Sequence, residues 1–130
     1  MSEAWHALSI AAAGGVGAAL RYGIDRAVAR GRRQAFPWAL LIVNLTGSLA
    51  LGVLTGLALG APVAELLGVG LLGGYTTFSS ASLDTAKLLA ARRFNAALVN
   101  GAGVLVAAVA CAVLGIALGS ALQNALINGI

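Results

Sequence analysis

Hydroxyl side chains gather near the middle of the chain, in the stretch GGYTTFSSASLDT at residues 73–85. Six Ser and Thr residues fall within the ten positions from Thr76 to Thr85, although 60% of the chain is hydrophobic. Each hydroxyl donates one hydrogen bond and accepts up to two, so the stretch offers polar partners to an ion or to the backbone. In water it would be typical of a loop. Its apolar surroundings instead indicate a polar site inside a membrane.

The composition places this site in a lipid bilayer. The chain has 130 residues, of which 9% are charged, and its mean hydropathy is +0.96, far from the soluble globular range. A membrane-spanning helix needs about 20 mostly apolar residues. We therefore predict an all-α membrane protein in which residues 1–130 form one domain with four transmembrane helices. The predicted spans cover about residues 5–22, 37–60, 62–88 and 95–118.

The first apolar segment is short, and it lacks the basic residues that precede the apolar core of a cleaved signal peptide. The only ionisable side chains near its start are those of Glu3 and His6, whereas a signal peptide carries basic residues ahead of its apolar core. We expect it to be a retained transmembrane helix.

Lysine and arginine residues are confined to the ends of spans on one side of the membrane. They are Arg21, Arg26, Arg30, Arg32, Arg33, Lys87, Arg92 and Arg93. By the positive-inside rule we expect a multi-pass protein of the cell membrane with these basic connections in the cytoplasm and both termini outside. The arginines lack interleaved aromatic residues that could stack on bases, so we expect no nucleic-acid partner.

The third span contains the hydroxyl cluster, and the sequence GGYTT at residues 73–77 predicts a break within it. Glycine and β-branched residues are poor in a helix interior. Backbone groups that a break sets free at membrane depth must be buried in protein or line a cavity or ion site. The predicted break therefore indicates an ion site.

Three further residues have both a structural and a functional interpretation. Asn44 lies on one stripe of the second span with Ser48, Gly52, Gly56 and Gly60, and its amide either bonds a neighbouring helix or donates to a passing ion. Arg21 either reaches the lipid headgroups or lies near an anion path, where Asp84 is a possible partner. Phe78 either packs against lipid or presents its electropositive ring edge to an anion.

No arrangement of residues indicates catalysis. The GVGLLG motif at residues 68–73 matches a dinucleotide pattern, but no predicted strand precedes it. One His and one Cys, at His6 and Cys111, are too few for a metal cluster. A four-span drug/proton antiporter has a similar size, but that mechanism needs a carboxylate in the first span, and residues 7–20 contain none.

Three segments resemble the Fluc, or CrcB, family of fluoride channels. They are GGVGAALRY at residues 14–22, VNLTGS at 43–48 and GGYTTFSS at 73–80, and the last is the most specific. The resemblance implies four-helix subunits that dimerise in antiparallel orientation, a structural sodium ion (Na+) at the dimer interface, and narrow pores formed from both chains. It implies a fluoride-selective ion channel subunit that exports cytoplasmic fluoride passively, and not an enzyme.

The resemblance also assigns roles to individual residues. Those assigned to the pore or the anion path are Asn44, Phe78, Ser79, Ser82, Thr77 and Arg21, and the carbonyls of Gly73 and Thr76 would hold sodium. Hydroxyl and amide donors suit fluoride because they replace the water of a small, strongly hydrated anion without trapping it as a fixed cation would.

The sequence departs from the family pattern at three places. Ala81 stands where a second pore phenylalanine is expected, Asp84 replaces a glutamate, and the fourth span has no Ser or Thr before Ser120. An alternative is therefore a mainly structural, poorly conducting subunit. The strong charge bias further suggests pairing with a second homologous chain of opposite orientation, while a homodimer stays open.

Overall fold

The computed structural model describes residues 2–31 and 36–129, and every regular element in these two ranges is helical. The elements in chain order are α1 (Glu3–Gly31), α2 (Trp38–Gly56), α3 (Ala61–Ala64), η1 (Glu65–Leu72), α4 (Gly73–Tyr75), α5 (Phe78–Ala90), α6 (Phe94–Leu98), η2 (Val99–Gly103) and α7 (Val104–Asn128). The segments η1 and η2 are π-helical turns. The all-α prediction is therefore confirmed for the described chain.

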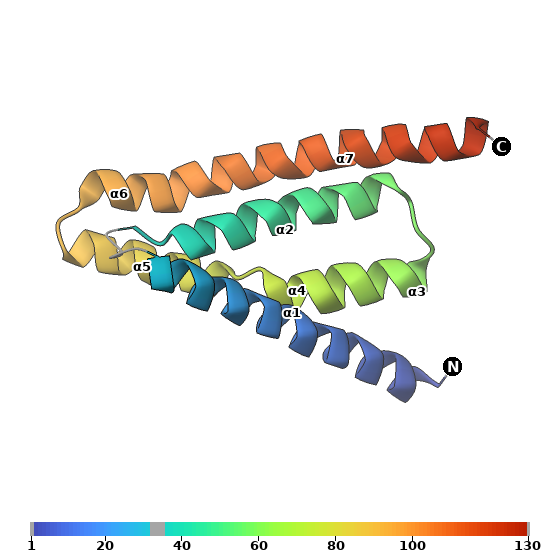
Figure 1. Cartoon of the computed structure of the whole chain (residues 1–130), viewed down its shortest axis with the longest axis horizontal. Helices are drawn as coiled ribbons and strands as arrows, with labels where there is room; N and C mark the ends of the chain where they lie inside the picture. Colours follow the sequence, from blue (N-terminus) through green and yellow to red (C-terminus); the bar gives the residue numbers. More distant parts are fainter. Residues whose placement is uncertain (1, 32–35, 130) are drawn as a thin grey trace.

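The chain passes back and forth four times, and both ends of the chain lie at the same end of the molecule (Figure 1). Three described helices are long and apolar enough to cross a membrane, namely Glu3–Arg30, Trp38–Gly56 and Phe94–Asn128. The remaining passage consists of α3, η1 and α4 followed by α5. Because this passage is interrupted, no single helix in it reaches the length of a span.

The helix bounds differ from the predicted spans at several ends. The first helix continues to Gly31, through part of the basic segment that we expected to be a connection. The second ends at Gly56 rather than near Gly60, and the last continues to Asn128. Charged residues at a helix end are compatible with helical backbone, so hydropathy marks the apolar part of a helix and not its full length.

The third passage is broken where the sequence predicted it. Helix α4 ends at Tyr75, and Thr76 (φ −82°, ψ 159°) and Thr77 (φ −154°, ψ 125°) are extended before α5 begins at Phe78. The break therefore falls on the two β-branched residues, whereas Gly73 and Gly74 stay helical. Extended backbone suits threonine, whose branched side chain restricts it in a helix.

Glycines allow α2 and α7 to pack with their backbones in contact. A Cβ atom added at Gly52 would lie within 2.2 Å of the Ala112 carbonyl oxygen, and one at Gly115 within 2.3 Å of the Leu49 carbonyl oxygen. Small residues permit this close approach in membrane helices, where no hydrophobic force drives association. Gly52 and Gly56 thus form the expected packing stripe, while Gly60 lies beyond the helix with nothing near its added Cβ.

The third passage packs against α1 in the same way. An added Cβ at Gly17 would lie within 2.0 Å of the Leu71 carbonyl oxygen, and one at Gly74 within 2.0 Å of the Gly14 carbonyl oxygen. At the end that holds the termini, the His6 Nε2 atom lies 2.5 Å from the Glu65 Oε2 atom. The glycine-rich first segment therefore positions the broken passage.

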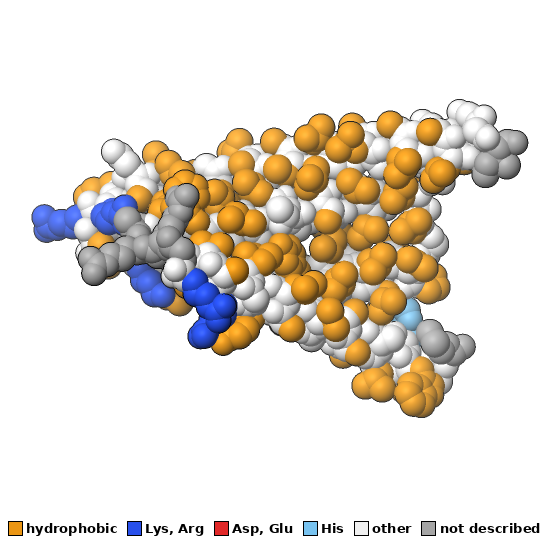
Figure 2. All heavy atoms as spheres, viewed as in Figure 1, with side chains coloured by type: hydrophobic (Ala, Val, Ile, Leu, Met, Phe, Trp, Pro, Cys, Tyr) orange, Lys and Arg blue, Asp and Glu red, His pale blue; other side chains and the backbone are white. Residues whose placement is uncertain are grey.

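The outer surface is apolar along most of the long axis of the molecule, as Figure 2 shows for one face. Large hydrophobic side chains such as Leu105, Val106 and Leu126 are exposed on α7, and the few buried ones include Val43 and Leu88. The visible Lys and Arg side chains lie at the end opposite the termini (Figures 1 and 2). This distribution is that of a multi-pass membrane protein.

Candidate functional site

Asn44 of α2 holds the break in the third passage through both atoms of its amide. Its Oδ1 atom accepts a hydrogen bond from the Thr77 backbone N–H at 3.1 Å, and its Nδ2 atom donates to the Thr77 carbonyl oxygen at 3.3 Å. Because a backbone N–H can only donate and a carbonyl can only accept, these two bonds fix the orientation of the amide. Asn44 therefore satisfies the Thr77 N–H, which the break sets free, and adds a hydrogen bond to the Thr77 carbonyl.

The Thr77 side chain begins the next helix. Its Oγ1 atom accepts from the Ser80 backbone N–H at 3.3 Å, as an N-cap residue does. The same atom lies 3.2 Å from the Ser79 hydroxyl and donates to the Ser80 hydroxyl at 3.3 Å. Part of the hydroxyl cluster thus serves to cap α5.

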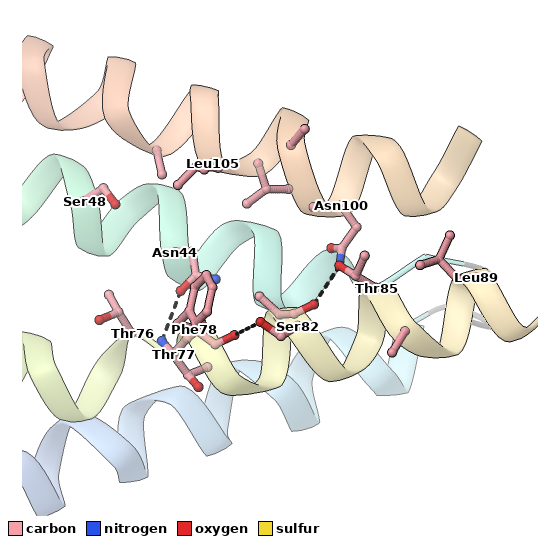
Figure 3. A pocket seen from close by; sticks show the side chains of 16 residues that line it. Asn44, Ser48, Thr76, Thr77, Phe78, Ser82, Thr85, Leu89, Asn100 and Leu105 are labelled. Carbon is pink, nitrogen blue, oxygen red and sulfur yellow. Dashed lines mark hydrogen bonds between the residues drawn. The ribbon is translucent and has the colours of Figure 1, made fainter. Parts of the chain in front are cut away.

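A pocket of about 660 Å³ lies beside the break, between α2, α5 and the fourth passage. The lining residues with polar side chains are Asn44, Ser48, Thr76, Thr77, Ser82, Thr85 and Asn100, and those with apolar side chains include Phe78, Ala81, Leu105 and Ala108. Figure 3 shows the polar groups arranged from Ser48 and Asn44 at one end to Thr85 and Asn100 at the other. Polar side chains thus line an otherwise apolar recess.

The pocket contains four of the six residues predicted for the pore or anion path. Asn44, Thr77, Phe78 and Ser82 line it, and the Phe78 side chain is 82% exposed. Ser79 is exposed but does not line this pocket. The structure therefore brings together side chains from α2 and α5 that are more than 30 positions apart in sequence.

Arg21 lies in a second pocket, of about 420 Å³, towards the basic end. This pocket is also lined by Asp25, Asp84 and Lys87. The Arg21 Nη1 atom reaches the Thr76 carbonyl oxygen at the long distance of 3.5 Å, whereas Asp84 pairs with Lys87 at 3.4 Å. The suggested pair of Asp84 with Arg21 is not among the ion pairs of the described residues.

Asn100 was not among the predicted site residues, yet it is the buried polar side chain of the described core, with 2% of its surface exposed. Its Nδ2 atom donates to the Thr85 hydroxyl at 2.8 Å and to the Ala81 carbonyl oxygen at 3.2 Å. The signal was present in the sequence, because Asn100 is an amide in an otherwise apolar span, and such groups need partners. The hydrogen bonds of Asn100 connect η2 to α5 at the pocket wall.

The two carbonyl groups predicted to hold sodium lie at the break. The Thr77 N–H, which would bond the Gly73 carbonyl in a continuous helix, is turned to Asn44 instead. Within residues 2–31 and 36–129 no hydrogen bond to the Gly73 carbonyl is found, and Gly73 is exposed. The Thr76 carbonyl has only its long contact with Arg21. Both oxygens therefore have free lone pairs.

Comparison with known proteins identifies relatives over most of the chain. Residues 8–116 match the family model described as CrcB-like protein, Camphor Resistance (CrcB). The chain is 40% identical over 116 residues to "Fluoride-specific ion channel FluC 1" of Leifsonia xyli, covering 86% of this chain and 85% of the relative. It is 45% identical over 102 residues to "Fluoride-specific ion channel FluC 2" of Mycobacterium bovis, covering 78% and 81%.

A third relative is "Fluoride-specific ion channel FluC 1" of Thermobifida fusca, 45% identical over 111 residues, with 85% of this chain and 92% of the relative covered. These relatives are named as ion channels and not as enzymes. The matched region includes the first segment, the break and the pocket described above. By this match and these identities, the chain belongs to the CrcB family.

Proposed function

We propose that this chain is a fluoride-selective ion channel subunit that lets cytoplasmic fluoride leave the cell passively. The observation that carries the proposal is the pocket in which Asn44, Phe78 and Ser82 meet beside the break, in a chain of the CrcB family. The names of the relatives support fluoride as the transported ion. Family membership also leaves no reason to retain the antiporter alternative.

The chemistry of the pocket suits a small anion. Amide and hydroxyl groups with a free proton can replace the hydration water of an anion without binding it as tightly as a fixed cation would. Phe78 adds a ring whose edge is electropositive. Arg21 and Lys87 line the second pocket and supply positive charge towards the basic end without lining the pocket beside the break.

Sodium is proposed as a structural ion bound by the carbonyl oxygens of Gly73 and Thr76. The break supports this assignment, since it leaves both oxygens with free lone pairs beside an exposed glycine. Hard cations prefer several oxygen ligands, so two carbonyls from one chain are too few. A second subunit would supply the others, and the bound ion would hold the two chains together.

The assembly we propose is an antiparallel dimer. Exposed apolar side chains and the one-sided pocket are compatible with a second chain covering this face. The basic end would face the cytoplasm and both termini the outside. Since all eight Lys and Arg residues fall within residues 21–33 and 87–93, we further propose that the partner is a homologous chain inserted the other way.

Fluoride efflux from liposomes tests the function directly. Liposomes with the purified chain are loaded with fluoride, efflux is read with a fluoride electrode, and chloride flux serves as the control. Fast efflux selective for fluoride is expected, from this chain alone or from the chain co-reconstituted with an oppositely oriented homologue. Asn44→Asp and Phe78→Ile should strongly reduce it. A correctly folded chain that is inactive in both preparations would contradict the proposal.

A second candidate is a mainly structural subunit that conducts little. It is favoured by Ala81, which lines the pocket where the family pattern has a phenylalanine, and by the apolar residues Val104, Leu105 and Ala108 on the facing wall. In a heterodimer, this candidate predicts that Asn44→Asp in this chain leaves most of the efflux, while the equivalent change in the partner removes it.

A further inference from the structure

The hydroxyl groups that line the pocket are not equivalent, because most of their protons are already engaged. Thr76 donates to the Leu72 carbonyl oxygen at 3.0 Å, and Ser82 donates to the Phe78 carbonyl oxygen at 3.0 Å. Thr85 donates to the Ala81 carbonyl oxygen at 2.8 Å. A carbonyl cannot donate, so in each bond the hydroxyl proton points at the backbone. These hydroxyls present lone pairs to the pocket, which repel an anion.

The remaining pocket groups on α5 and η2 are also engaged. Thr77 donates its proton to the Ser80 hydroxyl at 3.3 Å. The Asn100 amide can donate two hydrogen bonds, and it donates them to the Thr85 hydroxyl and the Ala81 carbonyl oxygen. Asn44, by contrast, uses one N–H for the Thr77 carbonyl and keeps the second free. The hydroxyl-rich stretch itself thus offers few donors to an anion.

Ser48 is the exception among the pocket hydroxyls. It lines the pocket, and within the described ranges its hydroxyl takes part in no hydrogen bond. Two other hydroxyls of the same helix do bond the preceding turn, Thr46 to the Ile42 carbonyl at 2.7 Å and Thr55 to the Leu51 carbonyl at 2.9 Å. No described side-chain oxygen is both buried and without a partner, so the Ser48 oxygen is accessible from outside.

We propose that Ser48 is a specificity-determining residue of the anion path and forms a donor pair with Asn44 on α2. The two residues are one turn apart, about 6 Å along the helix axis, and Figure 3 shows both on the same helix beside the pocket. An anion moving along α2 would accept a hydrogen bond first from the free Asn44 N–H and then from the Ser48 hydroxyl. The hydroxyl groups of α5 would line the pocket wall and stabilise the helix through their hydrogen bonds to backbone carbonyls. This inference deepens the proposed fluoride function and rests on it.

The test compares two identical chemical changes in one pocket. Ser48→Ala removes a free donor, and Ser82→Ala removes a hydroxyl whose proton faces the backbone. We expect Ser48→Ala to slow fluoride efflux about tenfold, the effect of losing one hydrogen bond to a charged group, and Ser82→Ala to slow it less. Thr55→Val controls for loss of a hydroxyl on α2 outside the pocket and should behave as wild type. Elution volume on size exclusion checks folding of each variant.

A second readout does not require conduction. Fluoride should raise the melting temperature of the purified protein more than chloride at equal sodium concentration, and Ser48→Ala should reduce this difference more than Ser82→Ala does. A wild-type protein that conducts fluoride neither alone nor with the oppositely oriented homologue, and whose melting temperature does not respond to fluoride, overturns the proposed function. A wild-type protein that responds, with Ser82→Ala impaired more than Ser48→Ala or Ser48→Ala unimpaired, overturns this inference alone.

Discussion

The Asn44 amide binds both backbone groups of Thr77, accepting from its N–H at 3.1 Å and donating to its carbonyl at 3.3 Å. One side chain of α2 thereby gives the Thr77 N–H the partner that the Gly73 carbonyl would be in a continuous helix. The same amide lines the pocket with its second N–H free. Asn44 consequently both supports the break and lines the pocket.

Asn44→Asp is expected to reduce fluoride efflux by about a hundredfold while the protein still folds. A carboxylate still accepts from the Thr77 N–H, but it cannot donate to the Thr77 carbonyl and it repels an anion. Asn95→Asp provides the matched control, since Asn95 is exposed on α6 and lines none of the described pockets. Equal rates for the two variants, measured in liposomes, would remove Asn44 from the path.

Gly52→Ala is expected to abolish stable folding, because its Cβ would lie within 2.2 Å of the Ala112 carbonyl oxygen. Backbone in a helix cannot move away without separating α2 from α7 along their length. Gly60→Ala is the control, since nothing lies within 4 Å of its added Cβ. The yield of monodisperse protein on size exclusion measures the difference, and an unchanged yield for Gly52→Ala would show that the helices can separate.

Asn100→Ala is expected to destabilise the protein by about 1–3 kcal/mol, the cost of a lost buried hydrogen-bonding group. The measured quantity is the melting temperature in detergent. Asn124→Ala, at an exposed position of α7, should have little effect. Combining Asn100→Ala with Thr85→Val should cost less than the sum of the two single changes, because the two side chains share one bond. Additive costs would contradict this coupling.

Removal of sodium is expected to weaken the proposed dimer, since the proposed ion would bind carbonyl oxygens of both chains. The ion itself is removed because backbone carbonyls cannot be deleted by substitution. Exchanging sodium for N-methylglucamine should lower the mass measured by light scattering from dimer to monomer or stop fluoride efflux. Potassium serves as the control for ionic strength and for cation size. A dimer with the same mass and the same efflux in all three salts would exclude sodium as a structural ion.

The chain expressed alone is expected to insert in one orientation. Its eight Lys and Arg residues all fall within residues 21–33 and 87–93, of which Arg32 and Arg33 lie outside the described residues, and such a bias along the sequence sets topology. Single cysteines placed at the termini, in a Cys111→Ala background, should react with an impermeant thiol reagent added outside intact cells. Termini labelled equally from both sides would instead favour a self-pairing chain that inserts both ways.

Hydropathy predicted the all-helical class, and the glycines and threonines of residues 73–77 predicted a break within that stretch, which the structure has at Thr76 and Thr77. The partner of the break could not be predicted, because Asn44 and Thr77 are 33 positions apart and their contact depends on how the helices pack. The same limit applies to Asn100 and Thr85. The direction of each hydroxyl proton depends on local backbone geometry, so composition alone overestimates the donors that Ser82 and Thr85 offer.

The interrupted third passage also constrains the order in which this protein is made. Its extended residues Thr76 and Thr77 cannot enter hydrocarbon with bare backbone groups, and the amide that covers Thr77 belongs to α2. That helix leaves the ribosome earlier, so the covering group is in the membrane when the broken segment arrives. Insertion of the broken passage therefore requires α2 as a neighbour, because Asn44 is the side chain that satisfies the Thr77 N–H.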